Sequence, residues 1–255
     1  MYQKKYPRST SWQQVGKWYK GLVSDKGHFY HQSLIMPGVI RLLALQNNSS
    51  LLDLACGQGV LARHIPKISS YLGIDSSSLL IDAARLKNHQ ENYKFIVGDV
   101  TKPLPVTKTD FSHTAIILAL QNIQNPQVLL SNAQKHLVSG GKLVIVINHP
   151  CFRIPRQSSW EIDQKNKLEY RRINRYLTPL KIPISNHPGH TNSPITWSFH
   201  WPISAICNFL FQVGFVIETI EEWASGKTSV GKAARMENRA RSEFPLFMAI
   251  AARKI

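Results

Sequence analysis

Residues 51–59, Leu51-Leu52-Asp53-Leu54-Ala55-Cys56-Gly57-Gln58-Gly59, decide the fold of this chain. They form a short apolar run that ends in a glycine-rich turn, a pattern typical of a strand buried on both faces of a parallel sheet. The pattern Gly57-x-Gly59-x-x-Ala62 fits G-x-G-x-x-G/A, in which glycines allow a ligand close to the backbone. The stretch therefore predicts the first strand and turn of a nucleotide-binding sheet.

Apolar runs and amphipathic segments alternate downstream of this turn. We expect strands at 71–74, 93–97, 114–120 and 143–147, and helices at 60–68, 79–86 and 129–137, the last one closed by Ser139-Gly140-Gly141. Such alternation is typical of βαβ units, which build a parallel sheet covered on both faces. The fold class predicted is α/β, a Rossmann-like doubly wound sheet.

The flanking segments do not follow this alternation. Residues 1–48 are rich in aromatic side chains and predict a helical cap, and 49–149 form the ligand-binding core. From 150 to 200 the chain is rich in proline and basic residues, which indicates an insert that acts as a lid. Residues 201–255 predict a helix and two final strands, at 214–217 and 246–252, with an antiparallel ending. We expect one domain over 1–255.

Composition narrows the class of protein. The 255 residues are 43% hydrophobic and hold no apolar run near the ~20 residues of a membrane helix, so we expect no membrane span and no signal peptide. Three scattered cysteines exclude a disulfide scaffold and favour a cytoplasmic location, and no metal-ligand pattern is seen. The net charge of +16 favours an anionic partner, either nucleic acid or an acidic small molecule.

Three of the seven aspartates lie at the ends of successive predicted strands: Asp53, Asp75 and Asp99. Ligands bind outside the carboxyl ends of parallel strands. Asp75 follows Gly57 by 18 residues, close to the spacing of an acid that binds ribose hydroxyls. Asp53 would repel a pyrophosphate but suits a ligand that carries an amine and a sulfonium, and Asp99 offers an acceptor for an adenine amine.

Five segments of the chain match one family in order and spacing: 51–59, 72–77, 97–100, 118–123 and 137–143. In these segments the sequence resembles the class I S-adenosylmethionine-dependent methyltransferases. Within that family it most resembles the small-molecule, ubiquinone/menaquinone-type branch. The resemblance implies a seven-stranded, mostly parallel sheet with an antiparallel last strand. It also implies S-adenosyl-L-methionine as cofactor, bound by the following residues: Tyr19, Asp53, Gly57, Gly59, Asp75, Ser76, Asp99, Val100, Leu118, Ala119 and Asn122.

Methyl transfer from a sulfonium needs a base only if the nucleophile arrives protonated. The candidate base is His149, at the end of the fifth strand, with His200 and His31 as further candidates and Cys151 as a candidate nucleophile. The segment 197–201 predicts an aromatic wall for a flat acceptor. Five arginines of the insert are candidates for binding an acidic group on the acceptor: Arg153, Arg156, Arg171, Arg172 and Arg175.

Three functions stay open at this point. The first is methyl transfer to a small, anionic or aromatic acceptor by in-line displacement. The second, suggested by the charge, is RNA methylation, although no RNA-binding module is visible. The third, supported by the glycine pattern alone, is an NAD(P)-dependent oxidoreductase. A member that binds the cofactor without transferring methyl groups also stays open, and the sequence does not indicate an oligomeric state.

Overall fold

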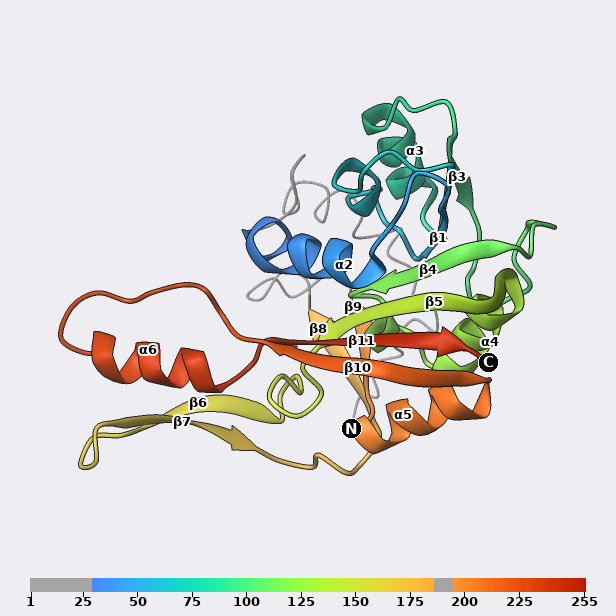
Figure 1. The fold of residues 1–255 in the computed structure, drawn as a ribbon. Coiled ribbons are helices and arrows are strands. Elements are labelled where there is room, and N and C mark those ends of the chain that lie inside the picture. Colours follow the sequence, from blue (N-terminus) through green and yellow to red (C-terminus); the bar gives the residue numbers. More distant parts are fainter. Residues whose placement is uncertain (1–28, 186–194) are drawn as a thin grey trace.

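The structure, a computed structural model, describes residues 29–185 and 195–255. Its centre is a seven-stranded sheet with the order β10-β11-β5-β4-β1-β2-β3 (Figure 1). Neighbouring strands from β3 to β5 run parallel, whereas β11 is antiparallel to both β5 and β10. The predicted fold class is therefore confirmed.

The strands of the sheet follow the expected apolar runs. All five residues of β1 are buried, as expected for a strand at the middle of a covered sheet. The bounds of the seven strands are β1 Ser50–Leu54, β2 Ser70–Asp75, β3 Tyr93–Val97, β4 Phe111–Ile117, β5 Leu137–Asn148, β10 Phe215–Trp223 and β11 Phe247–Lys254.

Helices cover both faces of the sheet and give two separate cores. One core packs η2 (His31–Ile35), α2 (Met36–Leu43), η3 (Leu61–Arg63) and α3 (Ser78–Lys87) against one face. The other core packs η4 (Leu120–Asn122), α4 (Pro126–His136) and α5 (Ile203–Gln212) against the opposite face. This three-layer arrangement leaves the carboxyl ends of the parallel strands as the place for a site.

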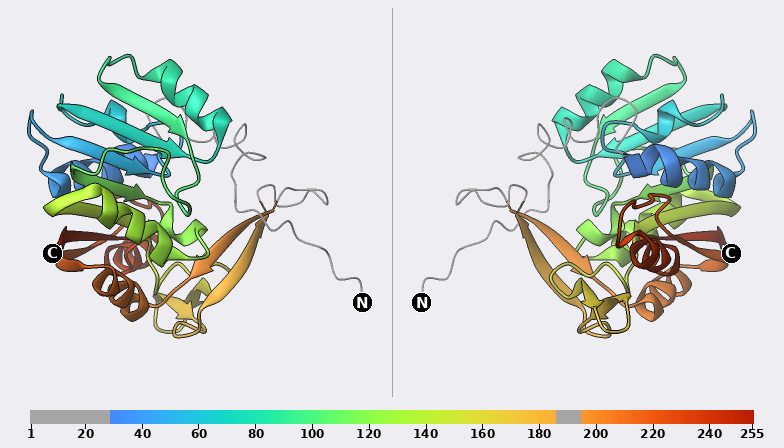
Figure 2. Two further views of the ribbon diagram at one scale, coloured as in Figure 1. Left: turned by 90° about the vertical axis from the view of Figure 1, so that its right-hand side faces the viewer. Right: turned by 90° about the vertical axis from the view of Figure 1, so that its left-hand side faces the viewer.

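The insert between β5 and α5 stands outside the main sheet, as predicted. It holds two antiparallel pairs, β6 (Ser158–Asp163) with β7 (Leu168–Ile173), and β8 (Leu180–Ser185) with β9 (Ile195–His200). β7 lies beside α6 (Ala234–Glu243), on the side of the sheet toward which β5 ends (Figure 1). Figure 2 shows the β8–β9 pair projecting from the sheet as a separate flap. The insert therefore extends from the edge where a site is expected.

Two predicted helices differ from the structure. The segment 60–68 holds only the short η3, because Gly59 and Pro66 leave few residues between them and proline disfavours helix in the residue before it. The helix predicted over 129–137 begins at Pro126 and ends at His136. Leu137 instead pairs with Phe111 at the start of β5, and both side chains are buried.

One further boundary differs, and one helix was not predicted. β4 ends at Ile117 rather than at residue 120, because Leu118 takes a left-handed conformation with φ 54°. The polar segment between the last two strands contains α6, and its only buried side chain is Ala240. A helix with so little apolar surface gives a weak periodic signal. No helix in the described ranges is long and apolar enough to cross a bilayer.

Candidate active site at the carboxyl edge of the sheet

Asp53 lies in the middle of the sheet, on β1, and its side chain is buried. The hydroxyl of Tyr71 on the neighbouring β2 donates a hydrogen bond of 2.5 Å to Asp53 Oδ2. The pKa of Asp53 is raised to about 7. Burial is the main cause, the hydrogen bond from Tyr71 opposes the shift, and the nearby Asp75 adds to it. A cation placed beside this carboxyl group would favour its ionised form and lower its pKa.

Asp75 joins the loops that follow β1 and β2. Its Oδ2 accepts a hydrogen bond of 2.9 Å from the backbone N–H of Gly57, and its Oδ1 accepts one of 2.9 Å from Ser77. Burial raises the pKa of Asp75, while these two backbone donors lower it. The carboxylate therefore sits against the glycine-rich turn, at the place that the sequence spacing indicated.

The backbone around this turn adopts left-handed conformations. Gly57 and Gly59 have φ of 55° and 69°, and Ala55 has φ 59°. A left-handed alanine costs about 1–2 kcal/mol, and such residues gather at functional sites. The guanidinium of Arg63 donates hydrogen bonds to the carbonyls of Gln58 and Gly59, at 2.7 and 3.0 Å, and so fixes the turn.

The other predicted cofactor residues lie around the same edge. Asp99 is exposed, and its Oδ1 accepts hydrogen bonds from the backbone N–H and hydroxyl of Thr101. Val100 is buried and Ser76 is exposed. Asp99 thus follows β3 as expected, but the hydrogen bonds of its side chain are confined to its own turn.

The segment after β4 forms the next part of the edge. Leu118 is left-handed and Ala119 is buried. The side-chain amides of Gln121 and Asn122 both donate to the carbonyl of Leu118, at 2.8 and 3.2 Å. Asn122 therefore shapes the strand end in this structure. Tyr19, the remaining predicted cofactor residue, lies outside the described residues.

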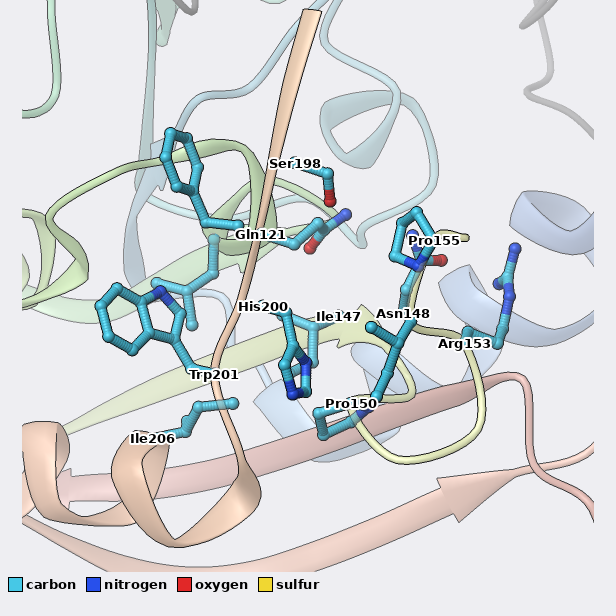
Figure 3. A pocket seen from close by; sticks show the side chains of 13 residues that line it. Gln121, Ile147, Asn148, Pro150, Arg153, Pro155, Ser198, His200, Trp201 and Ile206 are labelled. Atoms are coloured by element: carbon cyan, nitrogen blue, oxygen red, sulfur yellow. The ribbon is translucent and has the colours of Figure 1, made fainter. Parts of the chain in front are cut away.

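A small cavity, open to solvent, begins directly beyond this segment. It lies between the ends of β4 and β5, the start of the insert, β9 and α5 (Figure 3). Its lining is mostly apolar and includes the following residues: Leu120, Gln121, Ile147, Asn148, Pro150, Arg153, Ile154, Pro155, Ser198, Phe199, His200, Trp201 and Ile206. An apolar lining with a few polar groups is typical of sites that bind small organic molecules.

Few polar groups interrupt the apolar lining. The guanidinium of Arg153 lies over the ring of Phe247, at 5.0 Å, and donates to the carbonyl of Leu246. Burial lowers the pKa of Arg153, and within the described ranges no carboxylate forms an ion pair with it. Gln121 Oε1 and Trp201 Nε1 are buried without a hydrogen-bond partner. Arg153 is therefore the charged side chain of the lining, and Gln121 and Trp201 each bury one polar atom behind it.

His149, the candidate base, is occupied on both ring nitrogens. Nδ1 accepts from the backbone N–H groups of Cys151 and Phe152, and Nε2 lies 2.6 Å from a carboxylate oxygen of Glu222. Because both nitrogens are engaged, the ring anchors the start of the insert and offers no lone pair to an acceptor. Burial lowers its pKa, and the bond to Glu222 opposes that shift.

The other candidates of the sequence separate into two groups. His200, Phe199 and Trp201 line the cavity, whereas Trp197 is buried on β9 beside Lys181. His31 lies on η2 and is not part of the lining, and burial raises the pKa of the Cys151 thiol.

Of the five arginines, Arg153 alone reaches the cavity. Arg171 donates to the Phe152 carbonyl and stacks on Trp160, and Arg172 pairs with Glu161. Arg156 and Arg175 are exposed. The insert therefore uses most of its basic side chains for its own structure or on the surface.

Sequence reasoning missed three residues that shape the site: Tyr71, Arg63 and Gln121. Tyr71 lies in an apolar strand, where a tyrosine is ordinarily a core residue. Its pairing with Asp53 comes from the register Asp53↔Gly73, which places Tyr71 two residues earlier on the adjacent strand. No sequence signal identifies Arg63 or Gln121, because their partners are backbone carbonyls set by the loop conformation.

The donor set can be tested against S-adenosylmethionine. Two buried carboxyl groups at neighbouring strand ends, one with a pKa of about 7, favour a ligand that carries positive charge. Asp75 retains lone pairs for hydroxyl donors because a carboxylate has about four acceptor sites. A pyrophosphate would be repelled by these carboxyl groups because both carry negative charge. The residues present therefore fit a cationic nucleoside.

Comparison with known proteins agrees with this geometry. Residues 52–145 match a family described as "Methyltransferase domain". A demethylmenaquinone methyltransferase of Tropheryma whipplei is 27% identical over 203 residues, which cover 76% of this chain and 78% of that protein.

Solved structures show the same fold. A crystal structure of an S-adenosylmethionine-dependent methyltransferase from Mesorhizobium loti gives a TM-score of 0.65 at 24% identity and covers 85% of this chain and 96% of that one. Another, from Clostridium acetobutylicum, gives 0.60 at 15% identity, with 95% and 98% covered. The matched segment contains the glycine-rich turn, Asp53, Asp75 and the strands that position them. This chain therefore carries a segment that matches a methyltransferase domain, and it has the fold of solved S-adenosylmethionine-dependent methyltransferases.

Proposed function

We propose that this enzyme methylates a small organic acceptor bound in the cavity between β4, β5 and the β8–β9 pair. The observation that carries the proposal is the position of the cavity. It starts at Leu120, two residues after Leu118 at the end of β4, and so adjoins the edge that holds Asp53 and Asp75. The parallel strands bring both places to one side of the sheet.

The cofactor residues are proposed as follows. Gly57 and Gly59 let the methionine part approach the backbone, Asp53 lies near its positive charge, and Asp75 accepts the ribose hydroxyls. Ser76, Asp99 and Val100 surround the adenine, and Leu118, Ala119 and Asn122 close the site toward the cavity. Tyr19 belongs to this set by resemblance alone.

When bound, S-adenosylmethionine supplies a methyl group on a positively charged sulfur. The chain's own contribution is to position the acceptor, and alignment of two reacting groups is worth about 7–11 kcal/mol. Apolar side chains such as Ile147, Phe199 and Ile206 line the cavity wall and would shield a bound acceptor from water. No metal is needed for this chemistry.

The acceptor class follows from the lining. Flat aromatic side chains and few polar groups favour a planar, largely apolar acceptor, and Arg153 favours one with a carboxylate or phosphate group. The relative from Tropheryma whipplei is named for a quinone substrate, which supports a ring acceptor here. The three cysteines, all free thiols, support a reducing, cytoplasmic setting.

Two measurements test the proposal. Calorimetry should show binding of S-adenosylhomocysteine and no binding of NAD, and the reverse result would favour the oxidoreductase reading. Incubation with methyl-labelled S-adenosylmethionine and a metabolite extract should label one small molecule, which mass spectrometry identifies. If the enzyme binds the cofactor and labels nothing in the extract, small-molecule methylation is wrong.

We further propose that residues 150–200 act as the lid that selects the acceptor, within a single domain over 1–255. The insert supplies seven of the residues that line the cavity: Pro150, Arg153, Ile154, Pro155, Ser198, Phe199 and His200. Replacement of 150–200 by the corresponding segment of a relative should change the labelled product. If the labelled product is unchanged, residues 150–200 do not select the acceptor.

RNA is the second candidate acceptor, and the net charge of +16 favours it. The two readings differ in salt dependence, because each phosphate contact adds to the slope of affinity against salt concentration. A titration of the enzyme with RNA from low to high salt should show weak, nonspecific binding if the acceptor is small. Tight binding together with methyl transfer to RNA would overturn the small-molecule proposal.

A further inference from the structure

His200 is the titratable side chain that stands in the middle of the cavity wall. It is the last residue of β9, and its ring projects into the space bordered by Trp201, Ile147 and Pro150 (Figure 3). The residue is 5% exposed, so its ring is held by protein rather than by solvent. A buried imidazole in a cavity that adjoins a reactive group is a candidate for moving a proton.

The hydrogen bonding of the ring defines its tautomer. His200 Nε2 lies 2.6 Å from the backbone carbonyl oxygen of Tyr176. A carbonyl only accepts, so Nε2 carries the hydrogen and the neutral ring has its lone pair on Nδ1. Within residues 29–185 and 195–255, no group donates a hydrogen bond to Nδ1. This atom is also not one of the fully buried polar atoms that lack a partner. Nδ1 is therefore the basic atom, and it is open to the cavity.

The surroundings keep the ring neutral. Burial lowers the pKa of His200 below its usual value, and the Tyr176 carbonyl opposes part of that shift. Among the residues that the structure describes, the charged or titratable groups shown with it are Arg153, on the same lining, and Tyr176, whose ring centroid lies 6.0 Å away. The cavity lining contains no carboxylate that would favour the protonated ring.

His149 and His200 thus differ although both are buried histidines near the same cavity. His149 uses Nδ1 to accept from two backbone N–H groups and Nε2 to contact Glu222. His200 uses only Nε2. The structure places the available lone pair on the second of these two histidines.

We propose that His200 Nδ1 is the general base that takes the proton from a hydroxyl or N–H nucleophile of the acceptor during methyl transfer. The acceptor's O–H or N–H bond breaks, and its proton goes to Nδ1. The oxygen or nitrogen forms the new bond to the methyl carbon, and the electrons of the carbon–sulfur bond remain on sulfur. The imidazolium then returns its proton to water. This inference rests on the proposed function and adds the class of acceptor, one that arrives protonated.

The first test reads the ring directly and needs no substrate. Nitrogen-15 spectra of histidine-labelled protein at pH 7.5 should show His200 neutral, with Nε2 protonated and Nδ1 bare. The His200→Gln variant assigns the resonance. A ring that is protonated on Nδ1, or doubly protonated at this pH, would overturn the proposal.

The second test uses matched variants and the acceptor identified by labelling. His200→Gln places an amide near the position of Nε2, so it can still donate to the Tyr176 carbonyl while it lacks the base. We expect kcat to fall about 10²–10⁴-fold, with loss of the limb of the pH profile below pH 6.5, and unchanged affinity for S-adenosylhomocysteine. His89→Gln, at an exposed position, is the control and should leave both unchanged.

The outcomes separate the two levels of the proposal. Retained kcat and an unchanged pH profile in His200→Gln would overturn the role of His200 while methyl transfer stands. If the wild-type protein does not bind the cofactor, the proposed function is overturned. The nitrogen-15 spectra would still decide the protonation state of the His200 ring.

Discussion

The two halves of the carboxyl edge are built in different ways. The half around Asp53, Gly57 and Asp75 comes from two neighbouring strands and one turn, and is closed by hydrogen bonds among its own residues. The cavity half is assembled from five segments between residues 120 and 206, and it leaves two buried polar atoms, Gln121 Oε1 and Trp201 Nε1, without hydrogen-bond partners. A preformed half suits a ligand that is always the same, such as a cofactor. An incomplete half suits a ligand that differs between related enzymes, such as an acceptor.

This difference has an energetic side. A buried polar atom without a partner costs about 1–3 kcal/mol, so Gln121 Oε1 and Trp201 Nε1 lower the stability of the cavity wall. The cofactor half stores its cost in backbone strain instead, at Ala55 and Leu118. Substitutions in one half should therefore leave binding at the other half intact.

The largest effect is expected at Asp75. Asp75→Asn weakens the bonds to Gly57 N and Ser77 N and removes the charge, which should cost about 2–4 kcal/mol, or a 30- to 700-fold loss in affinity for S-adenosylhomocysteine by calorimetry. Asp82→Asn, an exposed position on α3, is the matched control. Equal affinities of the two variants would contradict the assignment of Asp75.

On the cavity side, Arg153→Met keeps the apolar stem on Phe247 and removes the cation. For an acceptor with a carboxylate or phosphate, KM should rise about 10- to 150-fold, because a hydrogen bond to a charged group is worth about 1.5–3 kcal/mol. Cofactor affinity should not change. Arg172→Met serves as the control on β7, and the same rise in KM there would point to a general charge effect.

Asp53 should make cofactor binding depend on pH. Its pKa of about 7 in the free protein falls when a cation binds beside it, so binding of S-adenosylmethionine releases a proton and affinity drops toward tenfold per pH unit below pH 7. Calorimetry in two buffers measures the proton released. Asp53→Asn should abolish this dependence, and persistence of the full effect in that variant would refute the role of Asp53.

The same shift predicts the pH dependence of stability without ligand. The folded-state pKa of Asp53 lies above the unfolded value of 3.8, so the folded state binds more protons between about pH 4 and 7. The contribution of Asp53 to stability is complete below pH 4 and is lost as the pH rises through 7. Urea titrations of the wild type and Asp53→Asn at several pH values isolate this contribution.

The smallest effect is expected from the strained turn. Ala55→Gly relieves a left-handed alanine and should raise the free energy of unfolding by about 0.5–1 kcal/mol, after the entropy that glycine adds to the unfolded chain. Ala205→Gly within α5 should lower it by about 1 kcal/mol. Denaturation curves of both variants check the prediction, and destabilisation by Ala55→Gly would show that the turn is not strained.

The sequence by itself determined the sheet, its two covered faces and the place of Asp53, Gly57 and Asp75. These follow from apolar periodicity and from a turn whose residues are contiguous, so local pattern and global fold agree. It failed at 60–68 and at Leu137, where a proline and a cross-strand partner override the helical period.

Only the tertiary structure decided which histidine has a lone pair to offer and which arginine reaches the cavity. His149 and His200 look alike in sequence, and so do Arg153 and Arg172. Their roles depend on backbone carbonyls, N–H groups and carboxylates brought from distant segments, such as Tyr176 to His200 and Glu222 to His149. Hydrogen-bond partners far apart in the chain leave no periodic signal, because each pairing is set by how the insert folds over the edge of the sheet.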